Sequence, residues 1–188
     1  GTLSWSNASG ASNVTGLSDA LVDGDESMYI GNDPSSTTSS AIKNVALGVK
    51  ALDAITTGDH NTALGFEALS SNTTGSNNAA SGTFALFRNT TGNYNTATGY
   101  DALTENTTGA SNTASGYRAL RYNTTGSENT ATGSNTLNSN TTGISNTALG
   151  YAALRNNTTG SFNTATGRNA LASNTAGLAN TALGYGAG

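Results

Sequence analysis

The signature Asn-x-Ala-x-Gly recurs every 17 residues over residues 44–188 of this 188-residue chain. It begins at Asn44 and continues as far as Asn180, which gives eight complete copies of the consensus N-T-A-x-G-x-x-A-L-x-x-N-T-T-G-x-x over residues 44–179 and the start of a ninth. Residues 27–31 (Ser-Met-Tyr-Ile-Gly) lie one period upstream, and we interpret them as a degenerate first copy. Such a fixed period indicates a repeat architecture in which each unit packs on its neighbours.

Fixed small residues alternate with freely variable positions within each repeat. Numbering from the Asn, position 3 is Ala and position 5 is Gly in all nine copies, while Leu at position 9 and Gly at position 15 occur in all eight complete copies. Positions 6, 7, 10, 11, 16 and 17 vary. The positions that we expect to be structural include Ala46, Gly48, Leu52, Ala63, Gly65, Leu69, Ala97, Gly99, Leu103, Ala114, Gly116, Leu120, Ala148, Gly150 and Leu154.

The repeat favours short strands over helices. Two obligatory glycines and an Asn-Thr-Thr run leave no room for a helical hairpin in 17 residues. Strands of three to five residues that turn at the glycines fit better. The sequence therefore predicts an all-β fold, a parallel β-solenoid with one coil per repeat, in which equivalent strands pair about 4.8 Å apart and Asn residues stack into ladders that satisfy their own amides.

The expected core is thin. We place Ala at positions 3 and 8 and Leu at position 9 inside the coil, together with the Leu, Thr or Ser at position 4. The chain contains only four Phe and one Trp, so a single stack has little apolar surface to offset chain entropy. We therefore expect a homotrimer of rods lying side by side, which would also cover the sheet edges.

The N-T-A-x-G and N-T-T-G columns resemble the head repeats of YadA-like trimeric autotransporter adhesins, and they are similar to repeats in marine bacteriophage tail fibres. The phage resemblance extends upstream to residues 17–20 and 27–31. The resemblance implies a left-handed β-roll, an intertwined or side-by-side trimer, and a location outside the cell or on a virion. It also implies the shaft or head of a fibre that attaches to a surface, with a cell-surface glycan or receptor as partner. The 17-residue period departs from the adhesin heads, whose repeats are usually shorter.

Residues 1–43 differ in composition from the repeats, and we treat them as a separate N-terminal segment. They contain Trp5, an acidic run over residues 23–26 and a loop around Pro34. One interpretation is a cap over the first coil. The other is a junction that donates a strand to a neighbouring molecule, which would make the chain the subunit of a head-to-tail filament.

No catalytic, cofactor or metal site is predicted. His60 lies beside Asp59, and Asp101 precedes Glu105 by four residues, but no nucleophile or second base recurs near either pair. The acidic run at 23–26 lacks the spacing of an EF-hand loop. We therefore expect a protein that is not an enzyme.

Two surface features remain as candidates for binding. Aromatic residues recur at position 6, where they would either stack on a carbohydrate or receptor or pack between adjacent coils: Phe66, Tyr100, Tyr117, Tyr151 and Tyr185. Threonine columns would suit an ice-binding solenoid acting as a monomer, although position 14 loses its Thr at Ala176.

Charge excludes other classes of partner. The net charge is −4, and the seven basic residues are scattered singly, so we expect no nucleic-acid binding. No stretch approaches the roughly 20 apolar residues of a membrane span, and we expect no membrane insertion. The absence of Cys excludes disulfides.

Overall fold

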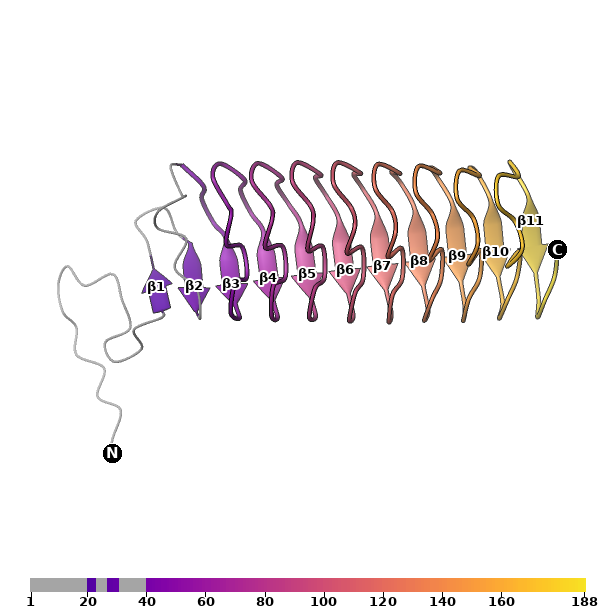
Figure 1. Cartoon of the computed structure of the whole chain (residues 1–188), viewed down its shortest axis with the longest axis horizontal. Coiled ribbons are helices and arrows are strands. Elements are labelled where there is room, and N and C mark those ends of the chain that lie inside the picture. Colours follow the sequence, from indigo (N-terminus) through magenta and orange to yellow (C-terminus); the bar gives the residue numbers. More distant parts are fainter. Residues whose placement is uncertain (1–19, 23–26, 31–39) are drawn as a thin grey trace, which may run out of the picture.

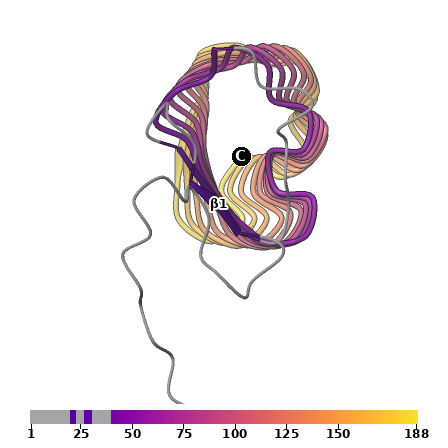
Figure 2. The same ribbon diagram turned by 90° about the vertical axis from the view of Figure 1, so that its left-hand side faces the viewer.

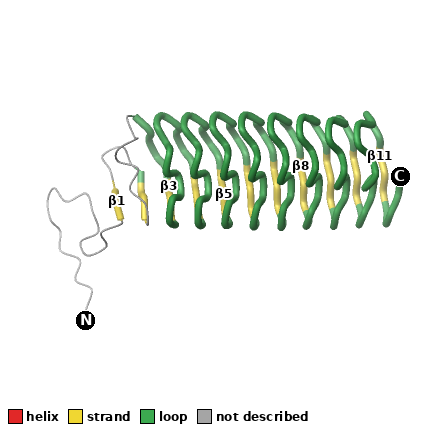
Figure 3. The backbone as a smooth tube through the Cα atoms, in the orientation of Figure 1, coloured by secondary structure: helices red, strands yellow, loops and turns green. Residues whose placement is uncertain are grey.

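The computed structural model describes residues 20–22, 27–30 and 40–188, and in these residues the chain forms a rod of stacked coils with strands and loops but no helix (Figure 1). Each strand is three residues long, and the strands lie side by side along the rod (Figure 3). They are β1 (Ala20–Val22), β2 (Met28–Ile30), β3 (Val45–Leu47), β4 (Thr62–Leu64), β5 (Ala79–Ser81), β6 (Thr96–Thr98), β7 (Thr113–Ser115), β8 (Thr130–Thr132), β9 (Thr147–Leu149), β10 (Thr164–Thr166) and β11 (Thr181–Leu183).

All strands belong to one sheet whose order follows the sequence. From β2 to β11 neighbouring strands are parallel, and between β3 and β11 the register shift is 17 residues throughout, as in the pairing of Ala97 with Ala114. Tyr29 pairs with Ala46 at the same 17-residue shift, so β2 occupies the strand position expected of a first copy at residues 27–31. β1 adds an antiparallel partner to β2. The predicted β-solenoid of 17-residue coils is confirmed, whereas its hand, the trimer and the domain division at residue 43 stay predictions.

Viewed end on, the coils superpose on one outline that is indented on one side (Figure 2). The interior contains the Ala of positions 3 and 8 and the Leu of position 9, as expected, and these residues are almost fully buried in most coils. Thr136 replaces Ala at position 8 in one coil, and its buried hydroxyl donates to the carbonyl of Gly150 at 2.7 Å. The buried apolar residues form a single core that extends along the rod from Tyr29 to Ala182.

The prediction that position 4 lies inside was wrong. Leu47 and Leu64 are 45% and 46% exposed, and the other residues at this position also face outward. Successive residues of a strand point to opposite sides of the sheet, so placing Ala at position 3 inside forces positions 2 and 4 outside. The sheet therefore has an outer surface made entirely of these two positions.

Two ladders of buried asparagine run through the coil interior. At position 1, the Asn112 side-chain amide donates to Asn95 Oδ1 at 3.1 Å and to the Gly126 carbonyl at 2.9 Å. At position 12, the Asn123 amide donates to Asn106 Oδ1 at 2.8 Å and to the same Gly126 carbonyl at 2.9 Å. The position-15 carbonyl thus joins the two ladders, and the prediction that stacked asparagines satisfy their own amides is confirmed.

Glycine is required at both fixed positions because adjacent coils approach closely. At position 5, Gly116 has a φ of 136°, and an added Cβ would lie 2.6 Å from the Gly133 carbonyl oxygen. At position 15, a Cβ on Gly126 would collide with the Asn123 side chain and with the backbone of the next coil. Any other residue at either position would force neighbouring coils apart.

The coil also holds residues other than glycine in the left-handed region, which the sequence did not predict. Positions 7, 9 and 17 have φ between 48° and 61°, including Leu120 at 51°. Such a conformation costs on the order of 1–3 kcal/mol for a residue other than glycine, and it persists only where the surroundings impose it. Backbone hydrogen bonds to adjacent coils hold it here, as between the Leu120 amide and the Thr136 carbonyl at 3.0 Å.

We predict that Ala114→Leu lowers the free energy of unfolding by about 1–3 kcal/mol, because the larger side chain overpacks a fully buried position. Ala176→Leu, the same substitution at an exposed loop alanine, is the matched control and should change stability by less than about 0.5 kcal/mol. Denaturant unfolding of both variants is the measurement. Equal destabilisation by the two would contradict the assignment of inside and outside.

We predict that Asn123→Ile lowers stability by about 2–6 kcal/mol, because the Oδ1 of Asn106 and one N–H of Asn140 lose their partners in the interior. Shape alone does not account for such a loss, since Ile55 occupies the same position, fully buried, in the coil before the ladder begins. Thermal unfolding beside an Asn135→Ser control measures the cost. Near-wild-type stability for Asn123→Ile would show that the ladder contributes little.

Candidate functional surfaces

The outer surface of strands β3–β11 carries no charge. Positions 2 and 4 of these strands, which we call the strand face, contain only Thr, Ser, Ala, Val and Leu. Several of its apolar side chains are well exposed, with Val45 at 38% and Leu149 at 49%. Three of its strands, β6, β8 and β10, read Thr-x-Thr. The result is a long, narrow, regular surface of methyl and hydroxyl groups.

Charged side chains of residues 40–188 lie instead on the variable loop positions, where several pair between neighbouring coils. Arg88 and Glu105 are 3.2 Å apart, and Lys50 and Glu67 are 3.7 Å apart. Exposed pairs of this kind contribute little to stability. The distribution of charge nevertheless distinguishes the loop side of the rod from the strand face.

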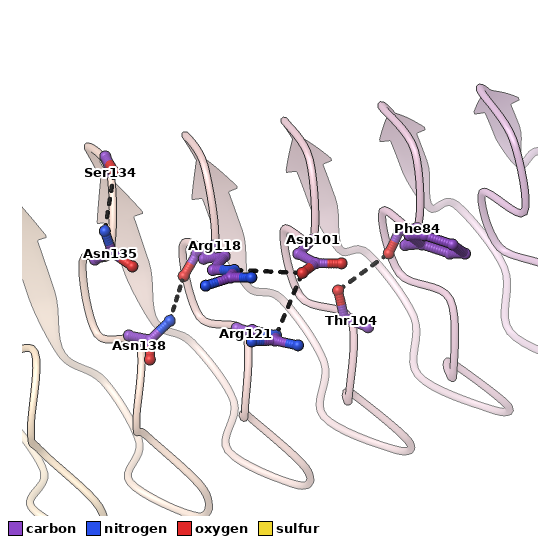
Figure 4. Close-up of polar contacts among 8 residues, drawn as sticks. All are labelled: Phe84, Asp101, Thr104, Arg118, Arg121, Ser134, Asn135 and Asn138. Atoms are coloured by element: carbon purple, nitrogen blue, oxygen red, sulfur yellow. Dashed lines mark hydrogen bonds and ion pairs between the residues drawn. The ribbon is translucent and has the colours of Figure 1, made fainter.

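Asp101 is the most enclosed of the paired carboxylates, with its side chain only 7% exposed. It contacts Arg118 at 3.5 Å and Arg121 at 3.4 Å, both from the next coil (Figure 4). In the same region the side chains of Thr104 and Asn138 donate to carbonyls of the preceding coil, those of Phe84 and Arg118, at 3.2 Å and 3.0 Å (Figure 4). These contacts tie successive loops together.

The residue pairs considered for catalysis have structural partners. Asp101 and Glu105 each contact arginine. Asp59 accepts a hydrogen bond from the Ile42 backbone amide at 2.9 Å, and the exposed His60 donates its backbone amide to the Ile42 carbonyl at 3.1 Å. Both pairs therefore connect neighbouring coils.

The aromatic residues at position 6 fall into two groups. In the first, Phe66 contacts Phe84 at a ring-centroid distance of 5.5 Å, Phe84 contacts Tyr100 at 6.1 Å, and Tyr100 stacks on Tyr117 at 5.7 Å. The guanidinium of Arg118 lies 4.8 Å from the Tyr117 ring centroid. Phe84, at position 7, joins this row but was missed in the sequence because only position 6 was considered.

The second group contains Tyr151 and Tyr185, which lie on either side of Arg168 in the same column. The guanidinium carbon is 5.3 Å from the Tyr151 ring and 5.9 Å from the Tyr185 ring. Most of the aromatic residues at position 6 therefore make ring contacts between coils, as one of the two interpretations expected. All five remain at least 43% exposed: Phe66, Tyr100, Tyr117, Tyr151 and Tyr185.

A groove of about 570 Å³ opens on the loop side, and the sequence did not indicate it. It is lined by Glu105, Tyr122, Thr124, Ser139 and Thr141. The hollow arises at position 11, where the large Tyr122 of one coil is followed by the small Ser139 of the next. Thr124 and Thr141 form the wall, and their hydroxyls donate to carbonyls of the following coil at 3.1 Å and 3.0 Å.

Several predicted features lie outside the described residues, namely Trp5, the acidic run at 23–26 and the loop around Pro34. In the part of the chain that is described, no three His, Cys, Asp or Glu side chains gather where they could hold a metal ion. The same residues include no apolar helix of membrane-spanning length. The asparagines of six repeated N-T-T segments are buried in the position-12 ladder: Asn72, Asn89, Asn106, Asn123, Asn140 and Asn157.

No protein-family model matches the chain, and no curated protein or solved structure is significantly similar to it. Any functional assignment therefore depends on the chemistry of the surfaces themselves. The strand face and the loop-side groove are the two surfaces whose composition suggests a partner.

Proposed function

We propose that the chain is a rigid shaft or head segment of an extracellular fibre, built from three left-handed rods lying side by side, as in a phage tail fibre or a bacterial surface adhesin. Its role would be structural and adhesive rather than catalytic. The observation that carries this proposal is the charge-free strand face, which extends along nine consecutive coils.

Homotypic association suits the composition of this face. Copies of one chain meet without like-charge repulsion, because every charged residue of the repeats lies on loop positions. Exposed leucine and valine side chains gain about 25 cal/mol per Å² when they leave water. Contact along the whole rod also uses the extent of the face, which is roughly 40 Å for nine strands.

Side-by-side association also suits a mechanical role. The hydrogen bonds between coils connect each strand to its equivalent in the next coil, so they run along the rod axis (Figure 1). A pulling force along the axis would act on one coil boundary after another. Lateral contact between three rods would distribute that force over several boundaries.

We predict a mass of about 56 kDa in solution by light scattering, corresponding to three chains of 18.7 kDa. The double variant Thr130→Arg/Thr164→Arg should shift the mass to that of one chain, because it places charge on the strand face. Thr125→Arg/Thr159→Arg, a matched pair of exposed threonines at position 14, should remain trimeric. A wild-type monomer would contradict the proposal, and a large polymer would favour the head-to-tail filament.

Ice binding is a second candidate, because three alternate strands of the face present Thr-x-Thr. Ser115 and Leu149 separate these strands, which is why we rank ice binding below self-association. The trimer requires the strand face to be covered by neighbouring chains, whereas ice binding requires the same face to be exposed. A monomer that shows thermal hysteresis, lost in Thr130→Arg/Thr164→Arg, would establish ice binding in place of the trimer.

A further inference from the structure

We propose that the loop-side groove around Tyr122 is a binding site for a neutral pyranose sugar. This assignment is independent of the oligomeric state. It places surface recognition at position 11 of the middle coils rather than along the position-6 aromatic stripe. Three features of the groove support it: an available ring face, unpaired hydroxyls and a single carboxylate.

Tyr122 offers a ring face that Tyr100 and Tyr117 do not. Tyr117 is stacked on Tyr100 and also contacts the guanidinium of Arg118, so its ring already has two partners. Tyr122 has one such partner, Arg121, whose guanidinium lies 4.9 Å from the ring centroid. Because Tyr122 is 43% exposed and borders the groove, its remaining face is accessible to the apolar C–H face of a sugar ring.

The polar groups of the groove match sugar hydroxyls. Within the described residues, the hydroxyls of Tyr122 and Ser139 make no hydrogen bond to protein, so both can donate and accept. Glu105 uses Oε2 in its contact with Arg88, and its other oxygen can accept from a sugar hydroxyl. The methyl groups of Thr124 and Thr141 complete an apolar wall.

Charge in the groove favours a neutral ligand. Glu105 is the one ionisable carboxylate among the lining residues, and it would repel a sialic acid, sulfate or phosphate group. Two arginines of the neighbouring loops already have carboxylate partners, since Arg88 contacts Glu105 and Arg121 contacts Asp101. A volume of about 570 Å³ is within the range of small-ligand sites, and the opening at the surface leaves room for a longer glycan.

The groove would stay open in the proposed trimer. Its residues occupy positions 11 and 13, about half a coil along the chain from the strand face. Figure 4 shows Arg121, the chain neighbour of Tyr122, on the loops away from the strands. Association through the strand face and sugar binding in the groove are therefore compatible.

The test begins with the full chain on an array of neutral, sialylated and sulfated glycans, followed by calorimetric titration of the best neutral glycan. We expect Tyr122→Ala and Glu105→Gln each to weaken binding by about tenfold or more, which corresponds to 1.4 kcal/mol. Tyr94→Ala is the matched control, since Tyr94 is a 65% exposed tyrosine outside the groove, and it should leave the dissociation constant unchanged.

Ser139→Tyr provides a second variant, which removes no side-chain hydrogen bond within the protein. It places at position 11 the residue that the preceding coil already carries there, fills the hollow and should abolish binding. Circular dichroism and light scattering on the same samples separate loss of binding from loss of fold or of the trimer. Failure to bind any neutral glycan, binding confined to anionic glycans, or an equal loss in Tyr94→Ala would overturn the proposal.

Discussion

The structure depends on the pairing of asparagine side chains with their own equivalents in the neighbouring coils. An amide is one of the few side chains that can donate to and accept from a copy of itself, so a column of asparagines stays hydrogen-bonded in an interior without water. Asn112 and Asn123 illustrate this, because both donate to the preceding asparagine and to the carbonyl of Gly126. Each buried polar group thereby gains a partner that exists only if the next repeat is identical and in register. The stability of the rod therefore depends on the recurrence of asparagine at the same two positions of each repeat.

This requirement divides the repeat into two sets of positions. Interior positions are held to Gly, Ala, Leu or Asn in most coils, because an added atom can collide with the next coil, as a Cβ at Gly116 would. Loop positions such as 7, 10 and 11 have no such limit, although the coil imposes left-handed backbone on position 7. They carry the charges, the aromatic rings and the groove. Any chemistry that distinguishes one stretch of the rod from another therefore lies at these variable positions.

Much of the scaffold could be predicted from the sequence, because the period fixes which residues stack. Register, strand length, the buried Ala and Leu columns and the need for glycine all follow from it. Leu47 shows where this reasoning failed: its column looked like core, but the alternation of a three-residue strand turns it outward. Leu120 has a left-handed backbone that its residue type does not suggest. The groove was not predicted because it arises from the difference in size between Tyr122 and Ser139 in adjacent coils. A consensus sequence does not record such differences between individual repeats.

Hydrogen exchange of the asparagine side-chain amides, resolved by NMR, tests the ladders most directly. Our account predicts strong and similar protection for the position-1 and position-12 asparagines of the middle coils, such as Asn95, Asn106 and Asn112, because their amides are buried and paired. Exposed asparagines such as Asn77 should exchange freely. Rapid exchange of the interior amides, at rates close to those of Asn77, would contradict the claim that paired asparagines hold the coils together.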